Sequence, residues 1–345
     1  MELVLTAVHV LLLSRYALVL LEYSLCGLRL LLDENISESI HGGDGDTMAT
    51  PVLRPFVRVG QAELNEVFEA AKDAYQRQRH FFSRNTRSLE FRKVLGFGSS
   101  GVVTLWTEIN QYRQRVRDLA IKAPVDEGDP YFRQEINWMS ETFATCEHFA
   151  QLIWLPDWVM DESLYNDYFG DNGSPALMIM DYFERCELYE LLTRVNESVS
   201  NNRNLPNHRK KLEFIPSRFL WRLFLCLTRA CIGMAYPPML DNNSPAVYRE
   251  VIRPDENPAL IIHFDLHPLN VFMDDFFLTR DDVREHGLTP RWKLGDFGLM
   301  QEWDNGWQDA EKFAVANVGK PGYQAPVRYI FISKRSEYQP RYCER

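Results

Sequence analysis

The stretch that decides the fold is IHFDLHPLN at residues 262–270, followed by LGDFG at residues 294–298. The first stretch places a carboxylate, Asp265, five residues before an amide, Asn270, and the second adds another carboxylate, Asp296. Histidine, aspartate and asparagine also gather in loops for reasons of turn geometry, so the first stretch alone is a modest signal. The two stretches in this order form a strong one.

These three polar side chains are the ones that phosphoryl transfer from a metal nucleotide requires. Asp265 would accept the proton of an attacking hydroxyl, while Asn270 and Asp296 would hold the magnesium ions that bridge the phosphates. The sequence therefore predicts a phosphotransferase that uses ATP and Mg²⁺, with Asp265 as its base.

A glycine-rich stretch lies upstream, where residues 96–103 read GFGSSGVV and fit the pattern G-x-G-x-x-G-x-V. Glycines let a hairpin turn lie flat over phosphates, with backbone N–H groups facing the oxygens. An ordinary β-turn is the alternative. A dinucleotide-binding loop would need a helix directly after the glycines, whereas VVTLW at residues 102–106 prefers a strand. Two strands are therefore expected within residues 89–106.

A third expected strand, residues 118–123, ends near a lysine, Lys122. A lysine at the end of a buried strand needs an anionic partner, because its desolvation is costly otherwise. Nucleotide phosphates and a helix carboxylate would supply one. Glu135 is favoured, because apolar residues follow it at helical spacing, and Glu141 is the second candidate. A solvated surface salt bridge is the alternative.

The chain resembles the protein kinase family over roughly residues 91–326, because these features follow one another in the order that is typical of that family. The resemblance implies an α+β, two-lobed fold with a small antiparallel β-sheet in the N-lobe and a helical, truncated C-lobe. It assigns catalytic roles to Asp265, Lys122 and Glu135. The nucleotide-binding residues that it implies are Gly96, Gly98, Gly101, Val103, Ala120, Lys122, Met180, Asp181, Phe183 and Glu187.

Within the resemblance, the apolar stretch that ends at Phe183 becomes a hinge that receives adenine. Met180 would line the back of the adenine pocket, and Asp181 and Phe183 would offer backbone hydrogen bonds to the base. Glu187 would offer a carboxylate to the ribose. Without the resemblance, residues 176–183 read only as a core strand.

The chain departs from the family at several positions. Phe264 stands where many kinases carry an arginine that pairs with a phosphate, so activation-loop phosphorylation is not the expected switch. His267 stands where a lysine usually lies near the γ-phosphate, and the resemblance makes it a further candidate catalytic residue. Lys320, within GKPGYQAPV at residues 319–327, would supply the missing cation catalytically, although a solvated loop lysine is the alternative. Val327 replaces a glutamate of the family's segment.

The expected activity is transfer of the γ-phosphate of Mg-ATP to a Ser or Thr hydroxyl of an unidentified protein substrate. Residues 265–268, DLHP, also resemble the loop of aminoglycoside and choline kinase-like phosphotransferases, so a small-molecule kinase stays open. A catalytically dead, truncated binding module is the third hypothesis, because several helices of a kinase C-lobe are missing. The match stops in mid-motif at Val327, and we expect a truncated product or gene model with a poorly packed tail after Pro326.

The chain divides into five parts, of which the two lobes and the hinge are what the resemblance implies. These are a hydrophobic segment with a linker at 1–47, a helical extension at 48–90, an N-lobe with its hinge at 91–183, a partial C-lobe at 184–327 and a divergent tail at 328–345. Apolar periodicity predicts helices at 61–80, 131–149 and 216–234. Polar, turn-rich composition predicts surface loops at 161–174, 196–211 and 240–257.

Composition limits the partners and the compartment. The net charge of −10 argues against non-specific binding of nucleic acid, which needs a basic surface. The six cysteines show no C-x-x-C spacing and are typical of reduced, intracellular thiols, which favours the cytoplasm. Residues 3–21 are nearly all apolar and about long enough to cross a bilayer. A membrane anchor and a protein that begins at Met48 both stay open, and a signal peptide fits less well.

Overall fold

The computed structural model describes residues 61–98, 100–126, 128–155, 177–185, 187–202, 214–239, 248–275, 289–304, 306–308, 310–312 and 319. The described residues form two compact units. We call residues 61–144 with 150–182 the sheet unit, and residues 145–149 with 183–319 the helical unit. The mixture of helices and strands, with a four-stranded antiparallel sheet, agrees with the expected α+β class.

The sheet unit is built on four antiparallel strands in the order β1-β2-β3-β4. The turn between the first two strands has a glycine on each side, because Gly98 pairs with Gly101 at the end of the β1–β2 pairing. The two strands predicted within residues 89–106 and the strand predicted at 118–123 are therefore confirmed. The bounds of the four strands are β1 Leu89–Gly98, β2 Gly101–Ile109, β3 Arg115–Pro124 and β4 Met178–Asp181.

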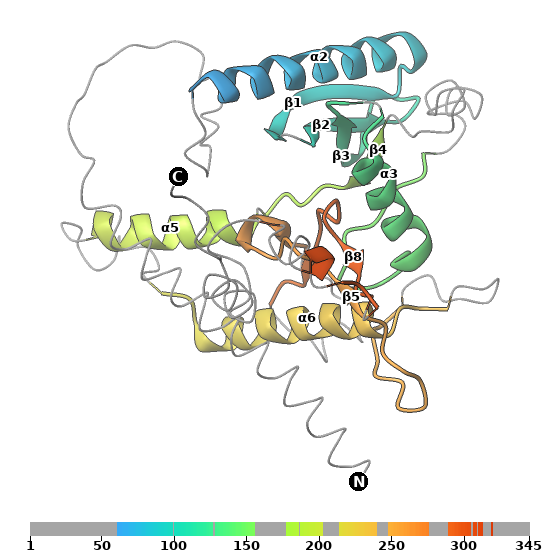
Figure 1. Ribbon diagram of the computed structural model, residues 1–345. Coiled ribbons are helices and arrows are strands. Elements are labelled where there is room, and N and C mark those ends of the chain that lie inside the picture. The colour runs from blue at the N-terminus through green and yellow to red at the C-terminus, as the bar shows by residue number, and fades with distance from the viewer. Residues whose placement is uncertain are drawn as a thin grey trace, which may run out of the picture. The chain divides into compact units, whose positions relative to one another are not determined.

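Helix α2, Gln61–Asn85, lies along one face of this sheet (Figure 1). The helix is the one expected at residues 61–80, and it continues one turn further. Its Ala71, Ala74 and Phe82 join a core whose members are all less than a tenth exposed. The other members come from the strands and their flanks and are Leu89, Val102, Trp106, Leu119, Ile121, Ala123, Leu155, Leu177 and Ile179.

The next helix, α3, spans Pro130–Asn137 and starts at a defined cap. Asp129 accepts a hydrogen bond from the backbone N–H of Tyr131, and a proline occupies the first turn, where its missing N–H costs nothing. A single turn of π-helix follows at Trp138–Thr142. The helix expected over 131–149 therefore ends early, and this prediction was wrong after residue 142.

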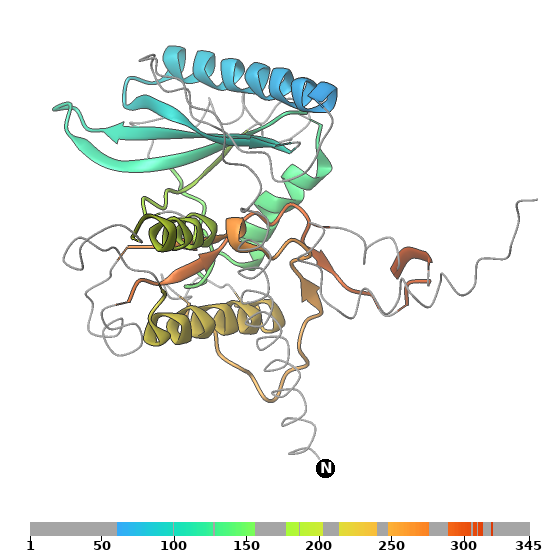
Figure 2. The ribbon, with the colours of Figure 1, turned by 90° about the vertical axis from the view of Figure 1, so that its left-hand side faces the viewer.

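The helical unit contains two long helices, α5 (Leu188–Asn201) and α6 (Ser217–Ala235). Between them lies a short antiparallel pair, β6 (Val271–Met273) and β7 (Trp292–Leu294), with α5 against β6 and α6 against β7 (Figure 2). The helix predicted at 216–234 is confirmed. The loop predicted at 196–211 is wrong at its start, because α5 runs through Asn201. A second pair joins β5 (Ile261–Ile262) to β8 (Gln301–Glu302).

No helix in the part of the chain that the structure describes is both long and apolar enough to cross a membrane. The apolar stretch 3–21, the remainder of residues 1–47, Lys320 and the tail 328–345 lie outside the described residues.

Candidate functional site

The loop after β5 holds the Asp265 carboxylate in a fixed orientation. Its Oδ2 atom accepts a hydrogen bond from Asn270 Nδ2 at 3.2 Å and lies 3.2 Å from His267 Nε2. Asn270 Nδ2 also donates to the backbone carbonyl of Asp265 at 2.9 Å. A short 3₁₀ turn over Pro268–Asn270 brings these groups together. The loop therefore holds one oxygen of the predicted base between an amide and an imidazole.

His267 acts on Asp265 from a buried position. Its side chain is 4% exposed, and its Nδ1 atom accepts a hydrogen bond from the backbone N–H of Leu269 at 3.3 Å. A neutral ring would therefore carry its proton on Nε2, the atom that faces Asp265. This arrangement gives His267 an orienting contact with Asp265.

His263 connects the loop of Asp265 to the stretch that carries Asp296. Its Nδ1 atom accepts from the backbone N–H of Asp265 at 3.3 Å, and its Nε2 atom donates to the carbonyl of Gly295 at 3.2 Å. Only a neutral imidazole can accept at one nitrogen and donate at the other. Burial lowers the pKa of His263, which favours this form. No local pattern in the sequence signals this role of His263.

Asp296 is exposed and has a left-handed backbone, with φ of 61°. Such a conformation is costly for a residue other than glycine and often marks a functional site. Its neighbours hold it in place. Gly295 donates to the carbonyl of Asn270 at 3.1 Å, and the fully buried Phe297 contacts the His263 ring with centroids 5.6 Å apart.

Phe264 and Gly319 meet closely in the same unit. Phe264 is buried and has a φ of 59°, and Gly319 has a φ of 91°. A Cβ atom on Gly319 would lie 2.0 Å from the Phe264 carbonyl oxygen and 3.6 Å from Asp265 Oδ1. Only glycine fits there. The start of the segment 319–327 therefore lies beside Asp265, while Lys320 itself is outside the described residues.

Lys122 and Glu135 form a buried ion pair within the sheet unit. The Nζ and Oε2 atoms are 2.7 Å apart, and the side chains are 7% and 4% exposed. The pairing predicted for Glu135 is confirmed, and Glu141, the second candidate, is exposed. The pair joins β3 to α3, so it fixes the lysine relative to the helix.

Packing requires one glycine of the β1–β2 hairpin but does not require two others. A Cβ on Gly101 would lie 2.5 Å from the carbonyl oxygen of Ala123, so packing against β3 requires glycine there. A Cβ on Gly96 or on Gly98 would meet no atom within 4 Å. Packing therefore does not explain Gly96 and Gly98, which agrees with a hairpin that lets another molecule approach.

The residues expected to line adenine are distributed along the sheet. Val103 pairs with Lys122 and Ala120 pairs with Met180, which is half-buried on β4. The N–H of Asp181 donates to the carbonyl of Gln151 at 3.1 Å. Any hydrogen bond between the Asp181 backbone and adenine must therefore have the Asp181 carbonyl as its acceptor.

Two further residues of the expected nucleotide set belong to the helical unit. Phe183 stacks on Phe272 of β6 with centroids 5.1 Å apart. Glu187 precedes α5, and burial raises the pKa of its carboxyl. Phe272 was missed in the sequence, although its position two residues after Asn270 on a strand was a usable signal.

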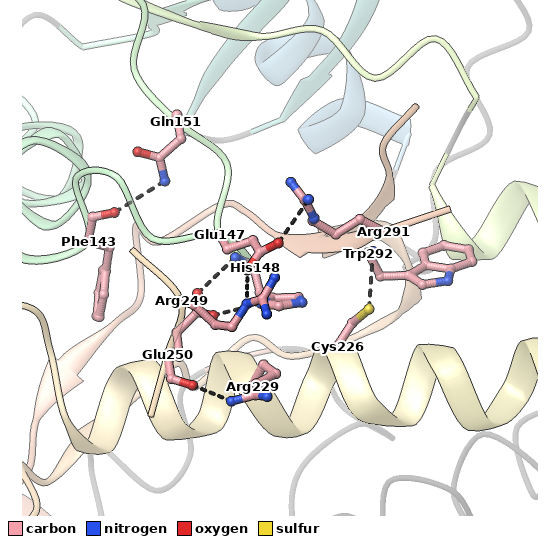
Figure 3. A network of polar contacts seen from close by, with 10 residues as sticks. All are labelled: Phe143, Glu147, His148, Gln151, Cys226, Arg229, Arg249, Glu250, Arg291 and Trp292. Carbon is pink, nitrogen blue, oxygen red and sulfur yellow. Dashed lines mark hydrogen bonds and ion pairs between the residues drawn. The ribbon is translucent and has the colours of Figure 1, made fainter. Parts of the chain in front are cut away.

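A buried network of charged residues anchors the segment 145–149 within the helical unit (Figure 3). His148 Nδ1 lies 2.7 Å from Glu250 Oε2, and the His148 backbone N–H donates to Glu250 Oε1 at 2.8 Å. Glu147 forms ion pairs with Arg291 at 2.8 Å and with Arg249 at 3.2 Å.

The donor atoms of Glu147, His148 and Glu250 lie within 4.8 Å of one another, close enough for a metal ion. However, arginines already neutralise Glu147, and His148 already binds Glu250. The network therefore reads as a structural one. No local pattern in the sequence signals this network.

Comparison with models of known protein families gives no match, and comparison with curated proteins gives none either.

Proposed function

We propose that the chain is a protein kinase-like phosphotransferase with a two-lobed fold, which transfers the γ-phosphate of Mg-ATP to a Ser or Thr hydroxyl of a protein. The observation that carries the proposal is the environment of Asp265. One carboxylate oxygen is fixed by an amide and an imidazole, and a buried histidine links its backbone to Gly295, next to Asp296. A general base needs this kind of orientation before its pKa matters.

The helical unit would supply the base and the metal ligands. Asp265 would accept the proton of the attacking hydroxyl. Asn270 uses its Nδ2 atom on Asp265, which leaves its oxygen as the atom to bind Mg²⁺. The exposed carboxylate of Asp296 would be the second ligand, since Mg²⁺ prefers oxygen donors. His267 would orient Asp265, and a cation from Lys320 stays part of the proposal.

The sheet unit would supply most of the groups that hold the nucleotide, and Phe183 and Glu187 of the helical unit would supply the others. Lys122, aligned by Glu135, would bind the α- and β-phosphates, and the hairpin with Gly96 and Gly98 would cover them. Adenine would receive a hydrogen bond from the Phe183 backbone and donate one to the Asp181 carbonyl. Glu187 would bind the ribose.

A small-molecule phosphotransferase is the second candidate. The observation that favours it is the DLHP sequence at residues 265–268, in which His267 contacts Asp265. A panel of peptide substrates, aminoglycosides and choline would separate the two candidates by the acceptor that is phosphorylated.

The proposal is tested first by nucleotide binding, which also separates it from a non-catalytic module that binds no nucleotide. Mg-ATP at a hundred times its Kd should stabilise the protein by about 2.7 kcal/mol. Lys122→Ala should abolish this stabilisation, and so should omission of magnesium. Lys72→Ala is the matched control, because that lysine is exposed on α2 and pairs only locally with Glu69. An undiminished effect of Mg-ATP on Lys122→Ala would exclude the assignment.

A further inference from the structure

Helix α2 bonds directly to the main chain of the strand that carries Lys122. Gln78 on α2 is fully buried, and its Nε2 atom donates to the carbonyl of Ile121, the residue before the lysine, at 3.1 Å. Its Oε1 atom accepts from Thr104 Oγ1 of β2 at 2.7 Å. Both ends of the buried amide are thus satisfied by the sheet.

A second polar side chain of α2 bonds to the same chain beyond the lysine. Arg77 donates through one guanidinium nitrogen to the carbonyl of Val125 at 3.2 Å and to that of Pro124 at 3.5 Å. These residues end β3 and lead toward α3, which carries Glu135. Helix α2 therefore holds the main chain on both sides of Lys122.

An aromatic side chain of α2 contacts the glycine hairpin. The rings of Phe68 and Phe97 meet edge to face with centroids 5.7 Å apart. Phe97 lies between Gly96 and Gly98, the two glycines that packing does not explain. Phe68 is half-exposed, at 49%, so burial of its own surface is incomplete.

A helix can cover a sheet through apolar contacts alone, whereas the hydrogen bonds of α2 also require a defined orientation of the helix. Apolar burial is non-directional, and a buried amide is costly unless both of its groups are bonded. A leucine at position 78 would cover the sheet without that demand. The hydrogen bonds of Gln78 instead fix where the helix lies along β3.

We propose that α2 is a positioning element for the groups that bind the nucleotide's phosphates. Phe68 fixes the glycine hairpin, and Gln78 with Arg77 fixes the strand and the corner around Lys122. This inference rests on the proposed function for its ligand, the triphosphate of Mg-ATP. The positioning itself can be measured without any nucleotide.

The first experiment compares two aromatic residues of the same helix in the full chain. Tyr75 contacts Phe91 at the other end of β1, with ring centroids 5.4 Å apart. Phe68→Ala should speed amide hydrogen exchange across residues 94–103 by about fivefold or more, because the hairpin opens locally. Tyr75→Ala should leave exchange in that peptide unchanged. Equal effects of the two variants on the hairpin would overturn the inference.

The second experiment uses Gln78→Met, which keeps the shape of the side chain and removes its hydrogen bonds. Thr104 keeps the Ile121 carbonyl as an acceptor at 3.2 Å and still accepts from Trp106 Nε1 at 2.9 Å. No buried donor of β2 is stranded, so global stability should change little. The KM for Mg-ATP should rise about three- to tenfold with kcat within about twofold, because alignment of Lys122 serves binding. An unchanged KM, or an equal rise in Tyr75→Ala, would overturn the inference.

A failure of the proposed function can be distinguished from a failure of the positioning role of α2. If the unmodified protein does not bind Mg-ATP, the proposed function fails, and the exchange experiment still decides whether α2 positions the hairpin. If the protein binds Mg-ATP and the exchange of Phe68→Ala matches that of Tyr75→Ala, the positioning role fails alone.

Discussion

The two sets of charged residues in the proposed site are built differently. In the sheet unit, a cation and an anion neutralise each other in a buried pair, with Lys122 7% and Glu135 4% exposed. In the helical unit, an amide and an imidazole contact Asp265, and Asp296 is exposed. Under the proposed function, the first set would align the nucleotide and the second would carry out the chemistry.

The largest expected effect is a loss of turnover when a residue of the helical unit is replaced. Asp265→Asn keeps the shape of the side chain and removes the base, so kcat should fall about 10²- to 10⁴-fold while Mg-ATP affinity stays nearly intact. Asp296→Asn should instead weaken magnesium-dependent binding. Single-turnover kinetics with parallel binding measurements would check both variants. Identical behaviour of the two would contradict the division of roles.

A comparably large effect on stability is expected in the sheet unit. Glu135→Ala leaves the Lys122 ammonium buried without its carboxylate, which should cost about 3–5 kcal/mol in the free energy of unfolding. Glu135→Gln is the control, because an amide oxygen can still accept from Lys122, and its loss should be smaller. Urea unfolding monitored by tryptophan fluorescence measures both. A Glu135→Ala protein as stable as the unmodified one would show that the pair does not stabilise the fold, and equal losses in the two variants would show that the charge of Glu135, not a hydrogen bond to Lys122, carries the stabilisation.

A smaller effect is expected at the close approach of Gly319 to Phe264. Gly319→Ala would strain a left-handed backbone and drive a Cβ atom against a carbonyl oxygen, so unfolding should become easier by about 1–3 kcal/mol. Gly96→Ala is the matched control, since its Cβ would meet nothing within 4 Å. The same denaturation experiment compares them. A Gly319→Ala protein as stable as the control would argue against the contact with Phe264.

The smallest effect is a pH dependence that arises from His263. Burial lowers the pKa of this histidine in the folded state, so the unfolded chain binds the extra proton first as the pH falls. The stability contributed by the neutral ring is present above the unfolded pKa, about 6.5. It is lost below that pH by at most about 1.4 kcal/mol per pH unit.

His263→Gln removes this titration, so its unfolding free energy should depend less on pH between about 6.5 and 5. Denaturation curves across that range compare the variant with the unmodified protein. Parallel pH profiles of the two proteins would show that His263 does not contribute.

Local signals in the sequence accounted for the elements near the glycine hairpin. The strands followed from β-branched residues around glycines, and Glu135 was identified because apolar residues placed its helix. The end of that helix was not predictable in this way. Phe143 and Phe149 continue its apolar spacing, yet both are fully buried in turns and a β-bridge beyond it.

Contacts between distant residues could not be predicted from any local pattern. His148 and Glu250 are 102 residues apart, and each alone reads as an ordinary polar residue. The last turns of α5 misled for a different reason, because asparagine and serine near position 196 are typical of loops. Here Ser198 is buried within the helix, and its hydroxyl donates to the carbonyl of Arg194. The linking role of His263 depends on Gly295, 32 residues away.

The segment 145–149 has a consequence for how the chain reaches its folded state. These five residues belong to the helical unit, although the chain before and after them belongs to the sheet unit. Glu147 and His148 find their partners only when Arg249, Glu250 and Arg291 have been synthesised. The closure of such long loops is slow, so the sheet unit would emerge from the ribosome with its connecting segment still exposed to chaperones and proteases. A fragment cut at Tyr182 would keep that exposure permanently.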